Sequence, residues 1–495
     1  MQTVTFQSAS YGMHPEEGTK GVAYDTAWTA RVRGQDGKSL FPECLSWLIA
    51  NQKQDGSWGG QIENFQDRII STLSAIIALK ELSGGKHEDR IRQGEDYIWN
   101  HVDKMKTHFH RLIGLELLFP SLMEQAEALD LGLPYHSNPF RKQYEEKLAK
   151  IDESLWYSPL VTLSYSLEFL NDNVDMTHLP EAQLPNGSVA TSPATTAFFL
   201  RHIRSEKAFG YLKKILSLTN DGSIMTVYPI EVFEYGWTMY NLMLAGLYFE
   251  RYAEICDFLY SGLKRTGVGW STELPVTDAD DTALACRALS AMDYPVDFKI
   301  FEPYNMRDYY IAFNFELDPS VSTNIHILDI ARLSLRFPDR ENVMERLIKF
   351  LEKEMQPGGF WLDKWHISPY YTTSHAIIAL SDTCPSLASR GISWILNSMN
   401  PNGTWGSNGG TLEETAYAIQ ALMYYHHHVE HVNLEFIHQA THMLQSRKCH
   451  SLLGNPPELW IGKVLYTPIR VVLSVVASAQ FMLKAQYVQS FSVAG

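Results

Sequence analysis

Three aspartates stand close together in the stretch VTDADDTALACRAL, which covers residues 276–289. Asp278, Asp280 and Asp281 fall at the start of a run of small and apolar residues that predicts a helix. An aspartate at this place can cap a helix, because its carboxylate accepts N–H groups of the first turn. Two other chemistries are open. Crowded carboxylates oppose each other's ionisation, so one can keep a proton and act as an acid, whereas ionised carboxylates can bind Mg²⁺.

The chain contains related segments that allow these alternatives to be compared. Each has a polar or Pro-containing start, a Thr, and then small and apolar residues at helical spacing. Each follows a turn that contains glycine, mostly with an aromatic residue. The segments are DRIISTLSAIIALK from Asp67, SPATTAFFLRHI from Ser192, TDADDTALACRAL from Thr277, SPYYTTSHAIIAL from Ser368 and TLEETAYAIQAL from Thr411.

The segment from Thr277 is the one with three acids over four positions. The corresponding positions of the others carry Asp67, Glu413 with Glu414, or no acid. Because a cap needs one acceptor, the excess favours a chemical role for the trio. Trp58 and Trp405, which lie in the glycine turns, are predicted to wedge between neighbouring helices as structural residues.

The periodicity of the chain predicts an all-α fold. Apolar residues at i, i+3 and i+4 are common, as in EYGWTMYNLMLAGLYF at 234–249, and the alternation typical of strands is scarce. The recurring unit of a turn and a helix, with small residues on the inner helix, predicts helical hairpins closed into two α/α barrels.

Composition excludes several classes of function. A formal net charge of -15 disfavours nucleic acid or an anionic membrane surface as the main partner. The five cysteines are scattered without paired spacing, which predicts reduced thiols and a cytoplasmic protein. The apolar stretch VVLSVVASAQFML near the C-terminus is too short to cross a bilayer, so a buried helix and no integral membrane segment are expected.

Aromatic residues are abundant, with 12 Trp and 25 Tyr, and aromatic faces stabilise cations. An acid in an aromatic pocket suits protonation of an alkene followed by carbocation chemistry. DADD at 278–281 and the Gly–Trp turns resemble the class II terpene cyclases, and GVAYDTAWTARV (21–32), VYPIEVFEYGW (227–237) and ELWIGKVLY (458–466) resemble their diterpene branch. The similarity covers nearly the whole chain, and DKWHISPYYTTSHAIIALSD (363–382) resembles the bacterial members in particular.

This resemblance implies a βγ didomain with the active site between the domains. The β domain would comprise residues 1–38 and 228–495, and the γ domain, residues 39–227, would be inserted after the first β-domain helix. The implied reaction is protonation of the terminal alkene of geranylgeranyl diphosphate, bicyclisation, and release of a bicyclic prenyl diphosphate.

The resemblance also implies roles for the acids. The general acid of the family matches Asp280, and Asp278 and Asp281 would tune it. Asn324, in SVSTNIHIL, is the predicted hydrogen-bond partner that orients the acid, although a local backbone bond would explain this Asn equally well. Further residues predicted by motif position to contact the substrate are Trp270, Trp365, Tyr371, Trp460 and Lys463.

Two departures from the plant members bear on the product. Plant copalyl diphosphate synthases carry His and Asn where this chain has Tyr165 and Thr226, and that pair holds a water that removes the final proton. Without it the cation should live longer, so that hydride and methyl shifts lead to a rearranged skeleton of clerodane (kolavenyl) or halimane type rather than to plain copalyl diphosphate. A clerodane-type (kolavenyl) diphosphate is the expected product, with halimadienyl or copalyl diphosphate as the alternatives. The alternative is that Tyr165 is a core aromatic residue.

The other expectations concern the diphosphate. The Asp-Asp-x-x-Asp motif that ionises diphosphates does not occur, so the group should survive for a downstream class I synthase or phosphatase. Lys147 is the predicted diphosphate contact. Mg²⁺ is expected as a cofactor with unclear ligands, because Lys104–Thr107 replace an acidic stretch of the plant members.

Four alternatives remain open from the sequence. They are a squalene–hopene-type cyclase, a drimane-type sesquiterpene cyclase, a protein-prenyltransferase β subunit and a helical-repeat scaffold without activity. The first is longer than this chain, and the third needs a zinc set for which Cys286 lacks the paired spacing.

Overall fold

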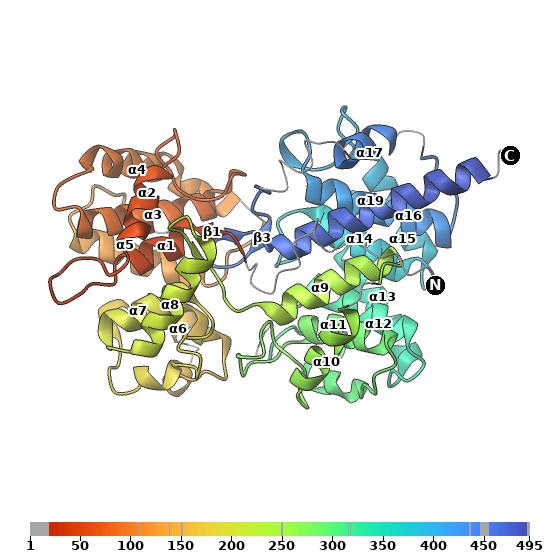
Figure 1. Cartoon of the computed structure of the whole chain (residues 1–495), viewed down its shortest axis with the longest axis horizontal. Helices are drawn as coiled ribbons and strands as arrows, with labels where there is room; N and C mark the ends of the chain where they lie inside the picture. The colour runs from red at the N-terminus through yellow and green to blue at the C-terminus, as the bar shows by residue number, and fades with distance from the viewer. Residues whose placement is uncertain are drawn as a thin grey trace.

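The computed structural model describes residues 19–107, 109–137, 139–149, 152–248, 251–314, 316, 318–434, 437–445 and 455–492. Two helical lobes lie side by side, joined near β1 and β3 (Figure 1). The predicted all-α architecture is confirmed, and the strands of the described residues are short pairs.

The first lobe is a ring of helices surrounded by a second layer. The inner elements α1, α3, α5, η3 and α7 contact one another in turn and close back on α1, while α2, α4, α6 and α8 pack outside. The bounds are β1 (Gly21–Val22), α1 (Ala23–Ala30), α2 (Pro42–Ala50), α3 (Phe65–Leu82), α4 (Glu88–His101), η1 (Val102–Thr107), α5 (Leu115–Ala128), α6 (Arg141–Leu148), η2 (Glu153–Leu155), η3 (Thr162–Asn173), η4 (Leu179–Ala182), α7 (Pro193–His202), α8 (Glu206–Thr219) and β2 (Ile224–Met225).

The second lobe repeats this plan. Its inner ring runs α9, α11, α12, α14, α16 and α19 and closes back on α9, with α10, α13, α15 and α17 outside. The bounds are α9 (Glu231–Leu244), α10 (Tyr252–Gly262), α11 (Ala279–Ala291), η5 (Phe298–Tyr304), α12 (Val321–Leu333), α13 (Arg340–Glu354), α14 (Pro369–Leu380), α15 (Pro385–Asn397), η6 (Ser407–Gly409), α16 (Leu412–His428), α17 (Ile437–Gln445), β3 (Trp460–Ile461), β4 (Leu465–Tyr466) and α19 (Ile469–Ser492).

The two layers differ in burial, as their sequences require. Residues Val321 to Arg332 of the inner helix α12 are all buried, whereas the outer helix α13 buries one apolar stripe. An inner helix packs on all sides and so uses small and apolar residues, while an outer helix keeps a charged face towards water. The apolar C-terminal stretch lies in the inner helix α19, and none of the described helices could span a membrane.

One shared hydrogen bond explains the threonine of the repeated segments. In each unit a backbone N–H of the glycine turn donates to the hydroxyl of a Thr on the following inner helix, which fastens the turn to that helix. The pairs are Trp58 with Thr72 (2.9 Å), Val189 with Thr196 (2.9 Å), Val268 with Thr282 (3.0 Å), Trp361 with Thr373 (3.0 Å) and Trp405 with Thr415 (3.1 Å).

The turn tryptophans add a second connection. Trp58 and Trp405 are fully buried, and their indole N–H groups donate to the carbonyl oxygens of Leu48 (2.8 Å) and Ile395 (2.7 Å). Each tryptophan therefore joins a turn to the preceding outer helix, as a structural residue does.

The first described helix does not belong to the second lobe. The prediction placed residues 1–38 with residues 228–495. Instead, α1 is part of the inner ring of the first lobe, where it packs against α3 and α7 of that ring and against the outer helix α2 (Figure 1). All of its residues from Ala23 to Ala30 are buried, which suits that central place. The segment just before it does reach the other lobe, because Lys20 N–H donates to the carbonyl of Thr467 (3.4 Å).

A hairpin of the second lobe ties the two lobes together. Strands β3 and β4 flank Lys463, which is completely buried against Glu168 of the first lobe, with a distance of 2.5 Å between Nζ and Oε1. The ammonium group also donates to the hydroxyls of Ser192 (2.7 Å) and Thr195 (3.0 Å). A buried cation with three partners is compensated for its lost hydration.

Candidate active site

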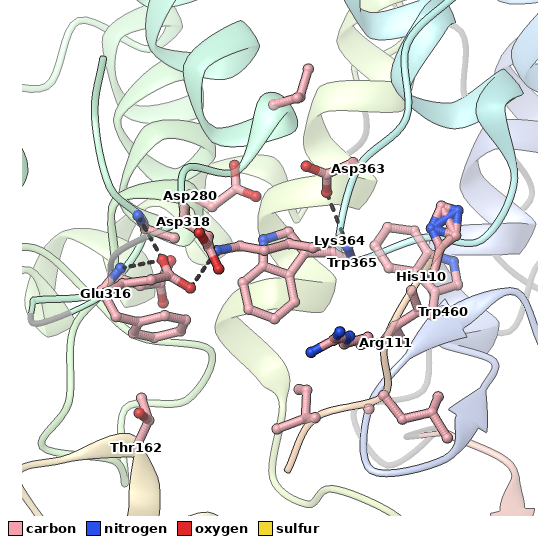
Figure 2. Close-up of a pocket in the computed structure, with 18 of the residues that line it drawn as sticks. His110, Arg111, Thr162, Asp280, Glu316, Asp318, Asp363, Lys364, Trp365 and Trp460 are labelled. Atoms are coloured by element: carbon pink, nitrogen blue, oxygen red, sulfur yellow. Dashed lines mark hydrogen bonds and ion pairs between the residues drawn. The ribbon is translucent and has the colours of Figure 1, made fainter. Parts of the chain in front are cut away.

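A cavity of about 630 Å³ opens between the two lobes. That volume lies in the range of pockets that enclose small-molecule ligands. Residues from both lobes line it (Figure 2). Among the lining residues are eight of those singled out in the sequence. These are Lys147, Tyr165, Trp270, Asp278, Asp280, Asp281, Trp365 and Trp460.

The three aspartates have separate places at the start of α11. Asp278 is the N-cap, and its carboxylate accepts the backbone N–H of Asp281 at 2.7 Å. The capping role is therefore real for one member of the trio. Asp280 and Asp281 occupy the first turn, each with 6% of its surface exposed. The extra acids thus stand at the cavity wall, where capping does not require them.

Asp280 is held by α12. Its Oδ1 lies 2.5 Å from Nδ1 of His326, and its Oδ2 accepts a hydrogen bond of 3.2 Å from the hydroxyl of Ser322. Both side chains of this pair are buried, so the contact is shielded from water. This fixes the carboxyl group of Asp280 at the cavity wall.

The predicted contact between Asn324 and the acid is wrong. The amide oxygen of Asn324 accepts the backbone N–H of Tyr310 (2.8 Å), and its amide nitrogen donates to the carbonyls of Tyr310 (2.9 Å) and Ser320 (2.8 Å). Helical geometry explains the difference, because Ser322 and His326 are four residues apart and share one face of α12. Asn324 stands about 200° around the helix from Ser322 at 100° per residue.

The carboxyl pair beside Asp280, formed by Asp278 and Asp281, retains a proton at neutral pH. Burial raises the pKa of Asp278 to about 7. Burial and the charge of Asp278 raise the pKa of Asp281 well above its ordinary value. A protonated Asp281 can donate to the carboxylate of Asp278, so the trio does not carry three negative charges at neutral pH.

Asp363 is a further acid at the cavity that lies close to Asp280, and the sequence reasoning missed it. Its carboxylate accepts hydrogen bonds from Ser322 N–H (3.1 Å), Ser320 hydroxyl (3.0 Å) and Trp365 N–H (3.1 Å), and its Oδ2 lies 3.0 Å from the Ser322 hydroxyl. Asp363 therefore fixes the loop segment before α14 that carries Trp365. Asp363 and Asp280 also share a contact with Ser322, because the one hydrogen of that hydroxyl is shared between them. Its place in DKWHISPYY, beside a predicted pocket tryptophan, was the available signal.

Aromatic rings form much of the remaining wall. Trp270 and Trp460 each have a fixed orientation, because their indole N–H groups donate to Thr191 (2.8 Å) and Glu413 (2.8 Å). Phe233, Trp237, Phe313 and Tyr466 also line the cavity and were not predicted. Their π faces can stabilise a carbocation that forms near Asp280.

Three of the predicted substrate contacts do not line the cavity. Tyr371 lies behind Trp237, whose indole N–H donates to its hydroxyl at 3.0 Å. Lys463 is paired with Glu168 inside the interface of the lobes. Thr226 lies behind Tyr165, whose hydroxyl donates to the Thr226 carbonyl oxygen at 3.1 Å.

Three cations stand at the cavity. Lys147 is paired with Glu116 at 2.6 Å, and Lys364 is paired with Glu316 and donates to the carbonyl of Asp318 at 2.7 Å. Arg111, which the sequence reasoning missed, is exposed and has no ionic or hydrogen-bond partner among the described residues. Figure 2 shows its side chain reaching towards Trp365. Arg111 is therefore the cation whose hydrogen bonds are open to a ligand.

The acids do not form a metal cage. Within the described part of the chain, no three His, Cys, Asp or Glu side chains are grouped as metal ligands. Protein sites for Mg²⁺ commonly use one or two carboxylates together with phosphate oxygens of the substrate. Of the acids that line the cavity, Glu316, Asp318 or Glu354 could supply one or two such carboxylates.

Comparisons with known proteins agree with this geometry. Residues 311–423 match the family model of the squalene-hopene cyclase C-terminal domain. The chain is 32% identical over 490 residues to the type B diterpene cyclase of Mycobacterium tuberculosis, which covers 93% of this chain and 95% of that protein. Among solved structures, the ent-copalyl diphosphate synthase from Streptomyces platensis superposes with a TM-score of 0.78 at 27% identity, over 96% of this chain and 97% of that one.

A plant relative matches over a shorter part of its length. The chain is 31% identical over 369 residues to a (-)-kolavenyl diphosphate synthase of Tripterygium wilfordii, covering 71% of this chain and 44% of the plant protein. An acid held at the wall of an aromatic cavity between two α/α barrels is thus found in a chain that aligns with a bacterial diterpene cyclase over nearly its full length. This chain belongs to the class II diterpene cyclases, which are isomerases.

Proposed function

We propose that the protein converts geranylgeranyl diphosphate into a bicyclic diphosphate of the clerodane (kolavenyl) type and releases it with the diphosphate intact. The observation that carries this proposal is the placing of Asp280, which His326 and Ser322 hold at the wall of an aromatic cavity. Such an acid can protonate an alkene, and the surrounding rings can stabilise the cation that results.

The reaction is an isomerisation in which one proton enters and one leaves. A proton passes from Asp280 to the terminal double bond and leaves a tertiary cation. Two internal double bonds then add in turn, so that two rings close and the cation moves along the skeleton. Hydride and methyl shifts move the cation further, and loss of a proton forms the final double bond. The carbon–oxygen bond to the diphosphate is not broken.

The wall at Tyr165 supports a rearranged skeleton. The Tyr165 hydroxyl donates to the Thr226 carbonyl, and burial raises the pKa of this phenol well above its ordinary value. Tyr165 therefore stays neutral and is not a base for the cation. Because Tyr165 does not take the proton early, 1,2-shifts have time to occur.

The product of the purified protein tests the proposal. Incubation with geranylgeranyl diphosphate, phosphatase treatment, mass spectrometry and NMR of the isolated alcohol should give a clerodane skeleton. Copalyl or halimadienyl diphosphate as the main product would contradict the skeleton but not the enzyme class. A higher rate with farnesyl diphosphate than with geranylgeranyl diphosphate would show that the protein is a drimane-type cyclase.

A paired variant tests the reason for the rearrangement. Replacing Tyr165 with His and Thr226 with Asn should restore an early base and move the product towards copalyl diphosphate. Tyr165→Phe is the control, because it keeps the ring without supplying a base, and it should keep the rearranged skeleton. An unchanged product from the paired variant would disprove this explanation.

We further propose that Arg111 binds the diphosphate, together with Lys147 and Lys364 after these release their carboxylate partners. Mg²⁺, where present, would be held by the diphosphate oxygens together with one of the acids that line the cavity, and it would screen the charge of the diphosphate. The ionic bonds of Lys147 and Lys364 must be exchanged before they bind a ligand, whereas Arg111 has no such bond to lose.

Arg111→Gln should therefore raise KM about 10-fold or more with little change in kcat, because a hydrogen bond to a charged group is worth about 1.5–3 kcal/mol. Arg141→Gln is a matched control, since Arg141 forms an exposed pair with Glu145 on α6 and does not line the cavity. Steady-state kinetics with geranylgeranyl diphosphate measure both variants. Equal KM values in Arg111→Gln and the wild type would exclude Arg111 as a diphosphate contact.

A further inference from the structure

A second buried histidine lies behind His326. His375, on α14, is joined to it by a bond of 2.8 Å between its Nδ1 and Nε2 of His326. Both imidazole side chains are completely buried. Asp280, His326 and His375 thus form a chain of hydrogen bonds that leads from the cavity into the interior of the second barrel. The chemistry described above uses the first two and leaves His375 without a role.

The contact between His326 and Asp280 decides where the proton of the acid lies. If Nδ1 of His326 carries no hydrogen, the carboxyl proton of Asp280 is taken up in an O–H···N bond to the histidine. If Nδ1 carries a hydrogen, it donates to Oδ1, and the carboxyl proton must lie on Oδ2. Only the second arrangement leaves a proton that Asp280 can transfer to an alkene.

The surroundings of His375 determine its own protonation. Burial lowers its pKa well below the ordinary value, so the ring is neutral and carries one N–H. The titratable and charged groups that face it from other elements are His326 and Asp329 from α12, Arg287 from α11 and His366 from the loop before α14. The polar rings around it are Tyr240 of α9, Tyr371 of α14 and Tyr417 of α16, with centroids at 4.7, 4.6 and 5.6 Å.

The one hydrogen of His375 is best placed on Nδ1. Nε2 of this ring is buried and has no hydrogen-bond partner among the described residues. Buried N–H groups without an acceptor are rarer and costlier than acceptors without a donor. The hydrogen therefore belongs on Nδ1, where it forms the 2.8 Å bond to His326.

We propose that His375 is a positioning residue that sets the tautomer of His326. Its Nδ1–H donates to Nε2 of His326, so the hydrogen of His326 must be on Nδ1, facing Asp280. This inference rests on the proposed role of Asp280 as the acid. The same principle operates in catalytic triads, in which a third residue holds the histidine in one tautomer.

Two substitutions separate this role from simple packing. The side-chain amide of His375→Asn can donate from the position of Nδ1, whereas His375→Leu fills space without a donor. We expect His375→Leu to lower kcat by about 10²–10⁴-fold with KM within about 3-fold of the wild type, the range of general acid catalysis. His375→Asn should retain kcat within about 10-fold. Tyr417→Phe is the packing control and should keep wild-type kinetics, because its ring contacts His375 without a hydrogen bond.

A measurement without substrate tests the tautomer directly. In protein labelled with ¹⁵N-histidine, NMR should show hydrogens on Nδ1 of both His326 and His375. The His326 signal, identified by its absence from His326→Gln, should persist in His375→Asn and disappear in His375→Leu. Because this readout does not need turnover, it stands even if geranylgeranyl diphosphate is not the substrate.

Three results would overturn the inference. They are a wild-type His375 without hydrogen on Nδ1, equal losses of kcat in the Asn and Leu variants, and wild-type kcat in His375→Leu. Should the Leu variant not accumulate as folded protein, the wild-type spectrum alone decides.

Discussion

Asp280→Asn should abolish cyclisation while leaving the protein folded. General acid catalysis contributes about 10²–10⁴-fold, and the asparagine amide cannot supply the proton that starts the reaction, so kcat should fall by at least the upper part of this range. The fold should persist, because the amide oxygen can still accept the N–H of His326 and the cap of α11 belongs to Asp278. Product formation from geranylgeranyl diphosphate and the thermal unfolding midpoint measure the two effects.

A matched substitution in a sister unit controls for this change. Glu414→Gln also converts a buried acid in the first turn of an inner helix into its amide, but Glu414 does not line the cavity. Its Oε1 accepts the hydroxyl of Ser368 at 2.7 Å, which an amide oxygen can also do, whereas the bond from the Ser407 N–H to Oε2 (3.2 Å) would be lost. This control should keep most of the wild-type activity. Turnover by Asp280→Asn at the wild-type rate would remove Asp280 as the acid and would revive the scaffold hypothesis.

Lys463→Met should cause the largest loss of stability. The substitution leaves Glu168 buried without its ammonium partner, and breaking a buried ion pair in this way costs about 3–5 kcal/mol. Tyr24 donates to the same carboxylate at 3.1 Å, which compensates only in part. Because the pair joins the hairpin β3–β4 to the first lobe, we expect the loss to appear as a lower free energy of unfolding in urea.

Two further variants give this prediction its controls. Lys463→Met combined with Glu168→Gln should recover part of the loss, because the double variant buries no unpaired charge. Lys349→Met removes an exposed lysine that pairs with Glu345 at 2.6 Å and should cost about 1 kcal/mol or less. Similar losses in Lys463→Met and Lys349→Met would show that the buried pair does not tie the lobes together.

The fold was largely predictable because its determinants are local. A glycine turn, a threonine hydroxyl and an inner helix of small residues recur within short segments, and the structure shows one hydrogen bond serving the same purpose in all five. The helix start at Asp278 could be predicted for the same reason, because cap and first turn are adjacent in sequence. The place of α1 was mispredicted, since short buried helices carry no local mark of the barrel to which they belong.

The sequence by itself determined the acid motif, the inner helices and the abundance of aromatic residues for the site, since each of these follows from residue type and short-range spacing. Only the tertiary structure decided which partners the acid has. His326 contacts Asp280 and Asn324 does not, because the packing of α12 on α11 turns one face of the helix towards the acid. Likewise, Lys463 and Arg111 are both cations, yet docking of the lobes buries the first against Glu168 and leaves the second open to the cavity. Long-range packing sets the direction and the solvation of a side chain, and these two properties decide which residues can take part in the chemistry.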